Sequence, residues 1–306
     1  MMMKALVRTV AGVECMQRSL PSLHSSKDVR IKLLRAAICR TDVFVARGII
    51  PVGDGRVLGH EFTGVIETIG DAVSHLKTGM RVVVNPLLSC GRCADCLAGL
   101  PHHCAETRFL GIHADGAFAQ YVVVAESQVF PLADSICDAV GAYAEPLAAT
   151  MAVLDADLPQ GGLIAVTGAG RIADLTELIL KDHGYEVTRV QAMAGHDAAF
   201  DVVVETDLCT ANVEATLRLL RPGGLLVLKS RMPEPVALPP LLCITRRIRV
   251  QAVHYVAFDR ALSYLDRCAD RLKHFIGSEW ALEDHQQAFA AACADEALKI
   301  YFKPNG

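Results

Sequence analysis

Residues 163–173 read Leu-Ile-Ala-Val-Thr-Gly-Ala-Gly-Arg-Ile-Ala, and this stretch decides the fold. An apolar, β-branched run, 163–167, meets a glycine turn at Gly168 and Gly170, and Arg171 and Ile172 open a helical pattern that continues to His183. In this strand-to-helix context, a Gly-x-Gly-x-x-Ala pattern lets the backbone approach a pyrophosphate at a helix N-terminus. The stretch predicts a strand–turn–helix unit that binds a dinucleotide, and a glycine turn without a ligand is the alternative.

Downstream of this unit, apolar strand patterns alternate with one helical pattern. We expect strands at Glu186–Val190, Phe200–Glu205, Gly224–Lys229 and Ile248–His254, and a helix at Asn212–Leu220. Such β-α-β alternation is typical of a parallel, doubly wound sheet, so the fold class is α/β. Ligands of such sheets bind at the carboxyl ends of the strands, which makes Thr206 a further candidate for cofactor binding.

The two ends of the chain have a different pattern. Short β-branched runs separated by Gly, Pro and Asp predict strands at 29–34, 64–69, 80–85 and 119–125. Near the C-terminus, two amphipathic helices (259–272 and 282–294) precede a last strand (298–303). The expected architecture is a β-rich domain of residues 1–149 and 255–306, with a nucleotide-binding domain of residues 150–254 inserted into it.

The inserted domain is short at one place. Gln191 and Ala192 follow its second strand, where such folds normally carry an Asp or Glu for the adenosine ribose. Only residues 192–199 lead to the next strand. An extended link of this length reaches roughly 26 Å and must span roughly 20 Å, so it cannot contain a helix. We therefore expect an extended crossover, a sheet that lacks about one strand, and an open adenine side.

Composition excludes several classes of function. The chain has 306 residues, of which 52% are hydrophobic and 21% charged, with a net charge of −4. The sequence contains no long block of Lys and Arg that would indicate nucleic-acid binding, and no apolar run reaches the roughly 18 residues of a membrane span. The start of the chain lacks the apolar core of a signal peptide, which favours a cytoplasmic protein. In that compartment, eleven cysteines indicate thiols and metal ligands more than disulfides.

Four of these cysteines are crowded into one loop-like lobe, residues 86–108. The spacing of Cys90, Cys93, Cys96 and Cys104 lets tight turns aim the thiolates at one ion. Four thiolates complete the tetrahedral shell of zinc and leave no open coordination position, so the site would be structural. Four unrelated buried thiols are the alternative, which the flanking glycines and proline disfavour.

Four further motifs complete a resemblance that runs nearly end to end. These are Cys39-Arg-Thr-Asp42, Gly59-His-Glu61, Asp115–Tyr121 and Glu145-Pro-Leu147. Together with the four-cysteine lobe, they resemble the zinc-dependent medium-chain dehydrogenases of the alcohol dehydrogenase superfamily, in the branch of the threonine, sorbitol and glucose dehydrogenases. The resemblance implies a GroES-like β-rich catalytic domain beside the Rossmann-like doubly wound sheet.

The resemblance also implies roles for individual residues. Cys39 and His60 would bind a catalytic zinc, with Glu145 as third ligand and Glu61 either behind the ligands or exchanging onto the metal. Thr41 would hydrogen-bond the alcohol oxygen, and Asp42 would hold the second imidazole nitrogen of His60. Arg40 is placed to meet the pyrophosphate. Phe44 departs from the family, in which many members have a proton-relaying His.

The expected function is hydride transfer between a small polar secondary alcohol, a polyol or amino alcohol, and NAD or NADP. Two zinc ions per chain are expected. The resemblance further implies a homodimer or homotetramer that binds a small-molecule substrate. The alternative is a zinc-retaining relic with weak or lost dinucleotide binding, acting as a scaffold, a binding protein or a lyase.

Overall fold

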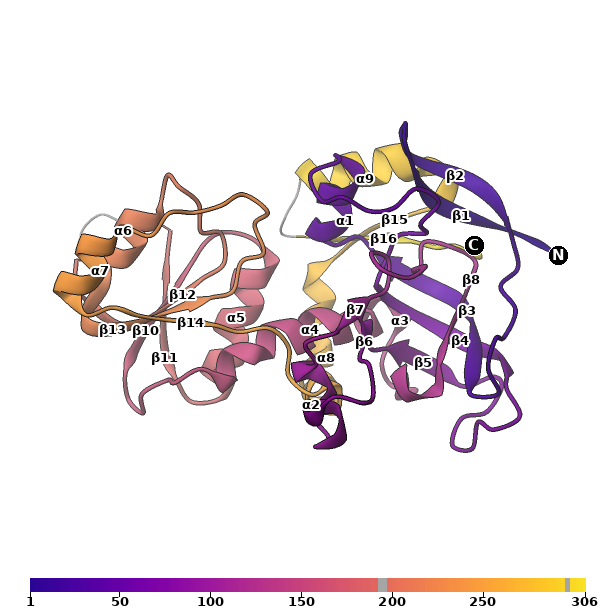
Figure 1. The fold of residues 1–306 in the computed structure, drawn as a ribbon, viewed down its shortest axis with the longest axis horizontal. Coiled ribbons are helices and arrows are strands. Elements are labelled where there is room, and N and C mark those ends of the chain that lie inside the picture. Colours follow the sequence, from indigo (N-terminus) through magenta and orange to yellow (C-terminus); the bar gives the residue numbers. More distant parts are fainter. Residues whose placement is uncertain (192–196, 295–297) are drawn as a thin grey trace. The chain divides into compact units, whose positions relative to one another are not determined.

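A computed structural model describes residues 1–191, 197–294 and 298–306, which form two compact units (Figure 1). The first unit comprises Met1–Pro146 and Ala257–Gly306, and the second comprises Leu147–Val256. These boundaries lie within three residues of the domain limits that the sequence predicts.

The second unit is built on a five-stranded parallel sheet with the order β11-β10-β12-β13-β14 (Figure 1). Its strands are β10 (Leu163–Thr167), β11 (Glu186–Val190), β12 (Phe200–Glu205), β13 (Leu220–Leu228) and β14 (Arg249–Ala252). The apolar side chains of β10 and β12 are almost completely buried, as expected for central strands of a sheet covered on both faces.

In the described part of this unit, helices α5 (Arg171–Asp182), α6 (Val213–Arg218) and α7 (Pro240–Arg246) connect its strands. The chain passes from β10 through α5 to β11 and then returns to the other side of β10 to form β12. The ends of β10 and β12 therefore form the switch point at which such sheets bind ligands.

The fold-class prediction is confirmed, including the shortened sheet. A six-stranded sheet of this type would have one more strand outside β11, whereas β11 is the edge strand in the described part of the unit. The prediction of an extended crossover at 191–199 falls largely on residues 192–196, which lie outside the described residues. It stays a prediction.

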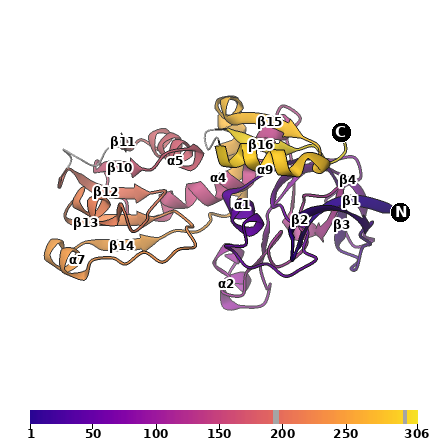
Figure 2. The ribbon, with the colours of Figure 1, turned by 90° about the horizontal axis from the view of Figure 1, so that it is seen from above.

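The first unit contains a mainly antiparallel seven-stranded sheet with the order β15-β16-β3-β4-β5-β9, in which β8 also pairs with β3. Both ends of the chain contribute to it, and both views show β16 from the C-terminus beside β15 (Figures 1 and 2). The strands are β3 (Asp28–Ala37), β4 (Glu61–Ile69), β5 (Arg81–Val84), β8 (Tyr121–Ala125), β9 (Val129–Pro131), β15 (Ile276–Trp280) and β16 (Lys299–Phe302).

Smaller elements surround this sheet. The hairpin β1 (Met2–Thr9) and β2 (Gly12–Ser19) precedes it, and β6 (Leu87–Leu88) pairs with β7 (Arg108–Phe109) at the base of the cysteine lobe. The helices are α1 (Arg40–Ala46), α2 (Ala94–Leu97), α3 (Asp138–Gly141), α8 (Phe258–Leu272) and α9 (His285–Ala294). A further helix, α4 (Ala144–Met151), begins in this unit and continues into the second. Among the described residues, no helix is both long and apolar enough to cross a membrane.

Candidate functional site

The four lobe cysteines lie together, as their spacing predicts. The sulfur atoms of Cys90, Cys93, Cys96 and Cys104 all lie within 4.8 Å of one another. Zinc–sulfur bonds of 2.3 Å in a tetrahedron place the sulfurs about 3.8 Å apart, so the four thiols need little movement to share one ion. The lobe therefore fits a closed structural zinc site.

Backbone N–H groups of the lobe already point at its sulfurs. The N–H of Cys93 donates to Sγ of Cys90, and the N–H of Cys90 donates to Sγ of Cys104, both over 3.4 Å. The bond from Cys90, partly opposed by burial, lowers the pKa of Cys104 to about 6. Such N–H groups favour the thiolate form that a metal requires.

A second group unites Cys39, His60 and Glu61, whose ligand atoms all lie within 4.8 Å of one another. The sheet brings the three residues together, because Ala37 at the end of β3 is the antiparallel partner of Glu61 at the start of β4. Cys39 follows β3 as the N-cap of α1, and His60 precedes Glu61. A thiol, an imidazole and a carboxylate are ligands that zinc accepts, so these residues fit the implied metal.

Asp42 lies beside both Cys39 and His60 of this group. Its Oδ2 accepts the N–H of Cys39 over 2.9 Å, while its Oδ1 lies 3.5 Å from Nδ1 of His60. Both side chains are buried. Burial lowers the pKa of His60, but Asp42 and Cys39 raise it by more, so the metal-free protein has a His60 pKa well above its usual value. Asp42 thus lies where the sequence analysis placed it, beside one imidazole nitrogen of His60.

The turn before His60 depends on Gly59. Its φ is +94°, and a Cβ there would lie 2.4 Å from the Phe118 ring. A larger residue would displace the Phe118 ring or shift the start of β4. On the other side, the ring of Phe109 packs edge-on against His60, with centroids 4.9 Å apart.

The remaining predicted catalytic residues lie in the same unit. The Thr41 hydroxyl is 3.8 Å from Sγ of Cys39. Glu145 is buried near the start of α4, and its charge contributes to raising the pKa of Glu61, so the two carboxylates are neighbours. Glu145 is not among the three residues grouped within 4.8 Å. Its part in metal binding stays a prediction.

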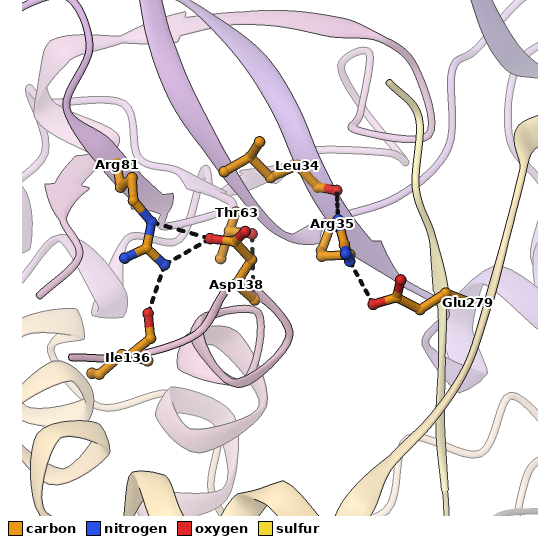
Figure 3. A network of polar contacts seen from close by, with 7 residues as sticks. All are labelled: Leu34, Arg35, Thr63, Arg81, Ile136, Asp138 and Glu279. Carbon is orange, nitrogen blue, oxygen red and sulfur yellow. Dashed lines mark hydrogen bonds and ion pairs between the residues drawn. The ribbon is translucent and has the colours of Figure 1, made fainter. Parts of the chain in front are cut away.

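A polar network anchors the chain segment that leads to Glu145 (Figure 3). The Arg81 guanidinium donates to Oδ1 of Asp138 over 2.7 Å and to the carbonyl of Ile136 over 2.6 Å. Thr63, two residues beyond Glu61 on β4, donates to the carbonyl of Asp138 over 3.2 Å. These bonds connect the start of α3 to β5 and to β4, the strand that begins with Glu61.

Sequence reasoning missed Lys299, which forms a buried ion pair with Glu61. Burial raises the pKa of Glu61, and the Lys299 ammonium opposes part of that rise. A single lysine in an otherwise apolar last strand was the available signal, but its partner lies more than two hundred residues away in the sequence.

The nucleotide turn lies in the second unit. Gly168 has a φ of +102°, and a Cβ there would lie 2.3 Å from Oγ1 of Thr206, which itself donates to the carbonyl of Thr167 over 2.8 Å. Gly170 is the N-cap of α5, which begins at Arg171 and continues with the partly exposed Ile172. The predicted turn residues are therefore adjacent at the switch point, whereas Arg40 begins α1 in the first unit.

Arg189 is a second residue that sequence reasoning missed at this turn. Its Nε donates to the carbonyl of Gly168 over 2.9 Å, and its Nη1 lies 3.1 Å from Oδ1 of Asp174 and 3.6 Å from Oε2 of Glu177. The sequence does not indicate this contact, because Arg189 lies within β11 and reaches Gly168 only through the pairing of β11 with β10.

Comparison with known proteins agrees with this geometry. Residues 25–134 match the alcohol dehydrogenase GroES-like domain family. The L-threonine 3-dehydrogenase of Rhizobium etli (strain CIAT 652) is 38% identical over 191 residues, which cover 60% of this chain and 54% of that enzyme. The chain thus matches about half the length of that relative. The sorbitol dehydrogenase of Halalkalibacterium halodurans is 27% identical, with 99% of both chains covered.

A solved structure extends the likeness to the whole fold. A protein of Sinorhizobium meliloti 1021, described as a zinc-binding dehydrogenase and bound to NADP, is 27% identical, with a TM-score of 0.85 over 99% of this chain and 100% of that one. Residues 25–134 therefore form an alcohol dehydrogenase GroES-like domain, and the whole chain is similar to zinc-type medium-chain alcohol dehydrogenases.

Proposed function

We propose that the protein is a zinc-dependent oxidoreductase that transfers a hydride between a small polar secondary alcohol, a polyol or amino alcohol, and NAD or NADP. The observation that carries this proposal is the group of half-buried Cys39 with buried His60 and Glu61, with Asp42 beside His60. The threonine and sorbitol dehydrogenase relatives favour this function over the zinc-retaining relic.

In this proposal, Cys39 and His60 hold the catalytic zinc, with Glu145 as third ligand and Glu61 close by. Three protein ligands leave one position open. A zinc ion held there supplies Lewis acidity, which lowers the pKa of an alcohol hydroxyl toward neutrality.

Of the other residues, Asp42 orients His60 and Thr41 moves a proton. Oδ1 of Asp42 lies 3.5 Å from Nδ1 of His60. A hydrogen bond accepted there would fix the tautomer that leaves Nε2 of His60 free to bind the metal. Thr41 lies next to the Cys39 sulfur and accepts the proton that the alcohol loses. Because Phe44 stands where many relatives have His, either this proton would leave through water and the cofactor ribose, or turnover would be slow.

The turn that would meet the pyrophosphate is formed by Gly168, Gly170, Arg171 and Ile172, with Thr206 at the adjoining strand end. Arg40, at the start of α1, stays a predicted cofactor-binding residue. The NADP of the Sinorhizobium relative supports a nicotinamide cofactor. Two zinc ions per chain belong to the same proposal. The cytoplasmic location and the homodimer or homotetramer stay predictions.

A substrate panel tests the proposal. Zinc-loaded protein would be assayed for NAD(P)H formation with polyols, amino alcohols and simple primary alcohols, then stripped with a chelator and reloaded with zinc. We expect activity with secondary polyols or amino alcohols, its loss on stripping and its return with zinc. Cys137→Ser, at an exposed cysteine, is the matched control for Cys39→Ser. A Cys39→Ser variant with full activity would refute the assignment.

A further inference from the structure

One buried carboxylate joins two loops at the carboxyl edge of the parallel sheet. Glu205 is the last residue of β12, and it is 0% exposed. Its Oε2 accepts the N–H of Leu208 over 2.9 Å. Its Oε1 accepts the N–H of Lys229 over 2.7 Å and the N–H of Ser230 over 3.0 Å. A single side chain therefore connects the loop that follows β12 to the loop that follows β13.

Only a carboxylate of this length satisfies all three N–H groups. It offers two acceptor oxygens and no donor, whereas the amide of glutamine has one acceptor oxygen and one donor group. The bonds from Leu208 and Lys229 are both buried. A buried N–H group that loses its acceptor destabilises the arrangement that buries it. Glu205 thus fixes the positions of both loops.

The first of these loops reaches the glycine turn. Thr206 lies between Glu205 and Leu208, the two ends of the bond that holds this loop. Its hydroxyl donates to the carbonyl of Thr167 over 2.8 Å and occupies the place where Gly168 would carry a Cβ. The bond from Leu208 to Glu205 therefore keeps Thr206 against the turn that precedes α5.

The strand order shows which half of a dinucleotide these loops would border. Sheets of this type bind the pyrophosphate at the turn after the first strand and the adenosine ribose at the end of the second strand. Here the first strand is β10 and the second is β11, so the adenosine half belongs to the β11 side. β12 and β13 lie on the other side of β10, where the nicotinamide half belongs.

We propose that Glu205 is a positioning residue for the nicotinamide half of the cofactor, which holds the loops after β12 and β13 in the arrangement that this half requires. Because Glu205 is 0% exposed, it acts through these loops and not by contact with the cofactor. This inference rests on the proposed function, since it requires NAD or NADP at the switch point. It predicts that a change at Glu205 weakens binding of the nicotinamide half and leaves binding of the adenosine half unchanged.

Glu205→Gln tests the proposal, with NADH as the complete dinucleotide and AMP as its adenosine half. The amide oxygen can keep the bonds from Lys229 and Ser230, but the amide nitrogen then presents a donor to the N–H of Leu208. We expect the dissociation constant of NADH to rise by on the order of tenfold and that of AMP to stay within about twofold. The fluorescence of fully bound NADH should shift toward that of free NADH. Glu186→Gln, at an exposed position at the start of β11, is the control and should match the wild type.

Equal weakening of NADH and AMP would overturn the proposal, because a general loss of structure in this unit affects both halves. Unchanged binding of NADH in a folded Glu205→Gln variant would also overturn it. If Glu205→Gln does not fold, Glu205→Asp decides, because its carboxylate is one methylene shorter and cannot span both loops. The same selective loss of NADH binding is expected there, and its absence overturns the proposal. Wild-type protein that binds neither NADH nor AMP would refute the proposed function, and this inference with it.

Discussion

Oδ1 of Asp42 lies 3.5 Å from Nδ1 of His60, and the other carboxylate oxygen of Asp42 accepts the N–H of Cys39 over 2.9 Å. One carboxylate thus contacts both residues that the proposed catalytic zinc requires. The 3.5 Å contact is longer than an ordinary hydrogen bond, and among the described residues neither Oδ1 of Asp42 nor Nδ1 of His60 has a hydrogen-bond partner.

Replacement of Asp42 by Asn tests this arrangement. The Asn carbonyl can still accept the N–H of Cys39, but its amide then presents a donor to Nδ1 of His60. The histidine is driven toward the tautomer with its proton on Nε2, which cannot bind zinc. We expect zinc affinity at this site to fall by about 10- to 100-fold.

Competition with a chromophoric chelator measures this affinity, and Asp71→Asn at an exposed position is the control. Wild-type affinity in a folded Asp42→Asn variant would mean that Asp42 does not orient His60.

Two separate ligand groups predict two zinc ions that can be lost independently. Cys93→Ser should remove the lobe zinc and keep the other, whereas Cys39→Ser should do the reverse. Because binding free energy of a structural zinc is folding free energy, only Cys93→Ser should lower the melting temperature strongly. Each 1 kcal/mol lost corresponds to roughly 2 °C in a chain of this size.

Elemental analysis and thermal unfolding of each variant give the answer, with Cys137→Ser as the common control. The two-site account fails if either single variant loses both ions, or if Cys93→Ser stays folded with its metal count unchanged.

NAD and NADP should bind weakly and with dissociation constants within about tenfold of each other. The end of β11 carries no ribose carboxylate, and the loss of one such charged bond costs roughly 1.5–3 kcal/mol. The nearby cation of Arg189 is paired with Asp174 and lies 3.6 Å from Glu177, so it offers little net attraction to a 2′-phosphate.

Calorimetric titration of zinc-loaded protein with each dinucleotide checks this expectation. Tight binding of one dinucleotide with strong selectivity would show that another segment rebuilds the adenosine pocket. Arg189→Met should weaken both dinucleotides by similar factors, because Arg189 contacts the carbonyl of Gly168 and not one particular cofactor. The exposed Arg249→Met variant is its control.

Local patterns predicted much of the fold. The bounds of β10, β11 and β12 agree with the sequence prediction because each strand is a short run of strand-forming residues followed by glycine or polar residues. The predicted strand at 224–229 in fact begins at Leu220, so Gly223 and Gly224 lie inside β13. The β1–β2 hairpin was missed because β2 is largely polar and only partly buried.

In the candidate site, residues that are close in sequence were predicted, whereas residues brought together by strand pairing were not. The four lobe cysteines are close in sequence, so their spacing alone indicates a shared ion. Lys299 and Glu61 meet only because β16 and β4 flank β3, and Arg189 meets Gly168 only because β11 pairs with β10. A local sequence pattern does not indicate which strands pair, and these contacts form only when the strands are assembled into sheets.

The central claim is hydride transfer between a secondary alcohol and a nicotinamide at the Cys39–His60 site. The most direct measurement is isotope transfer, in which zinc-loaded protein is incubated with NAD or NADP and a polyol deuterated at its carbinol carbon. Mass spectrometry of the nicotinamide should show one deuterium in the reduced cofactor, with none in the Cys39→Ser variant. Reduced cofactor without the label, or product formed with no reduced cofactor, would contradict the account.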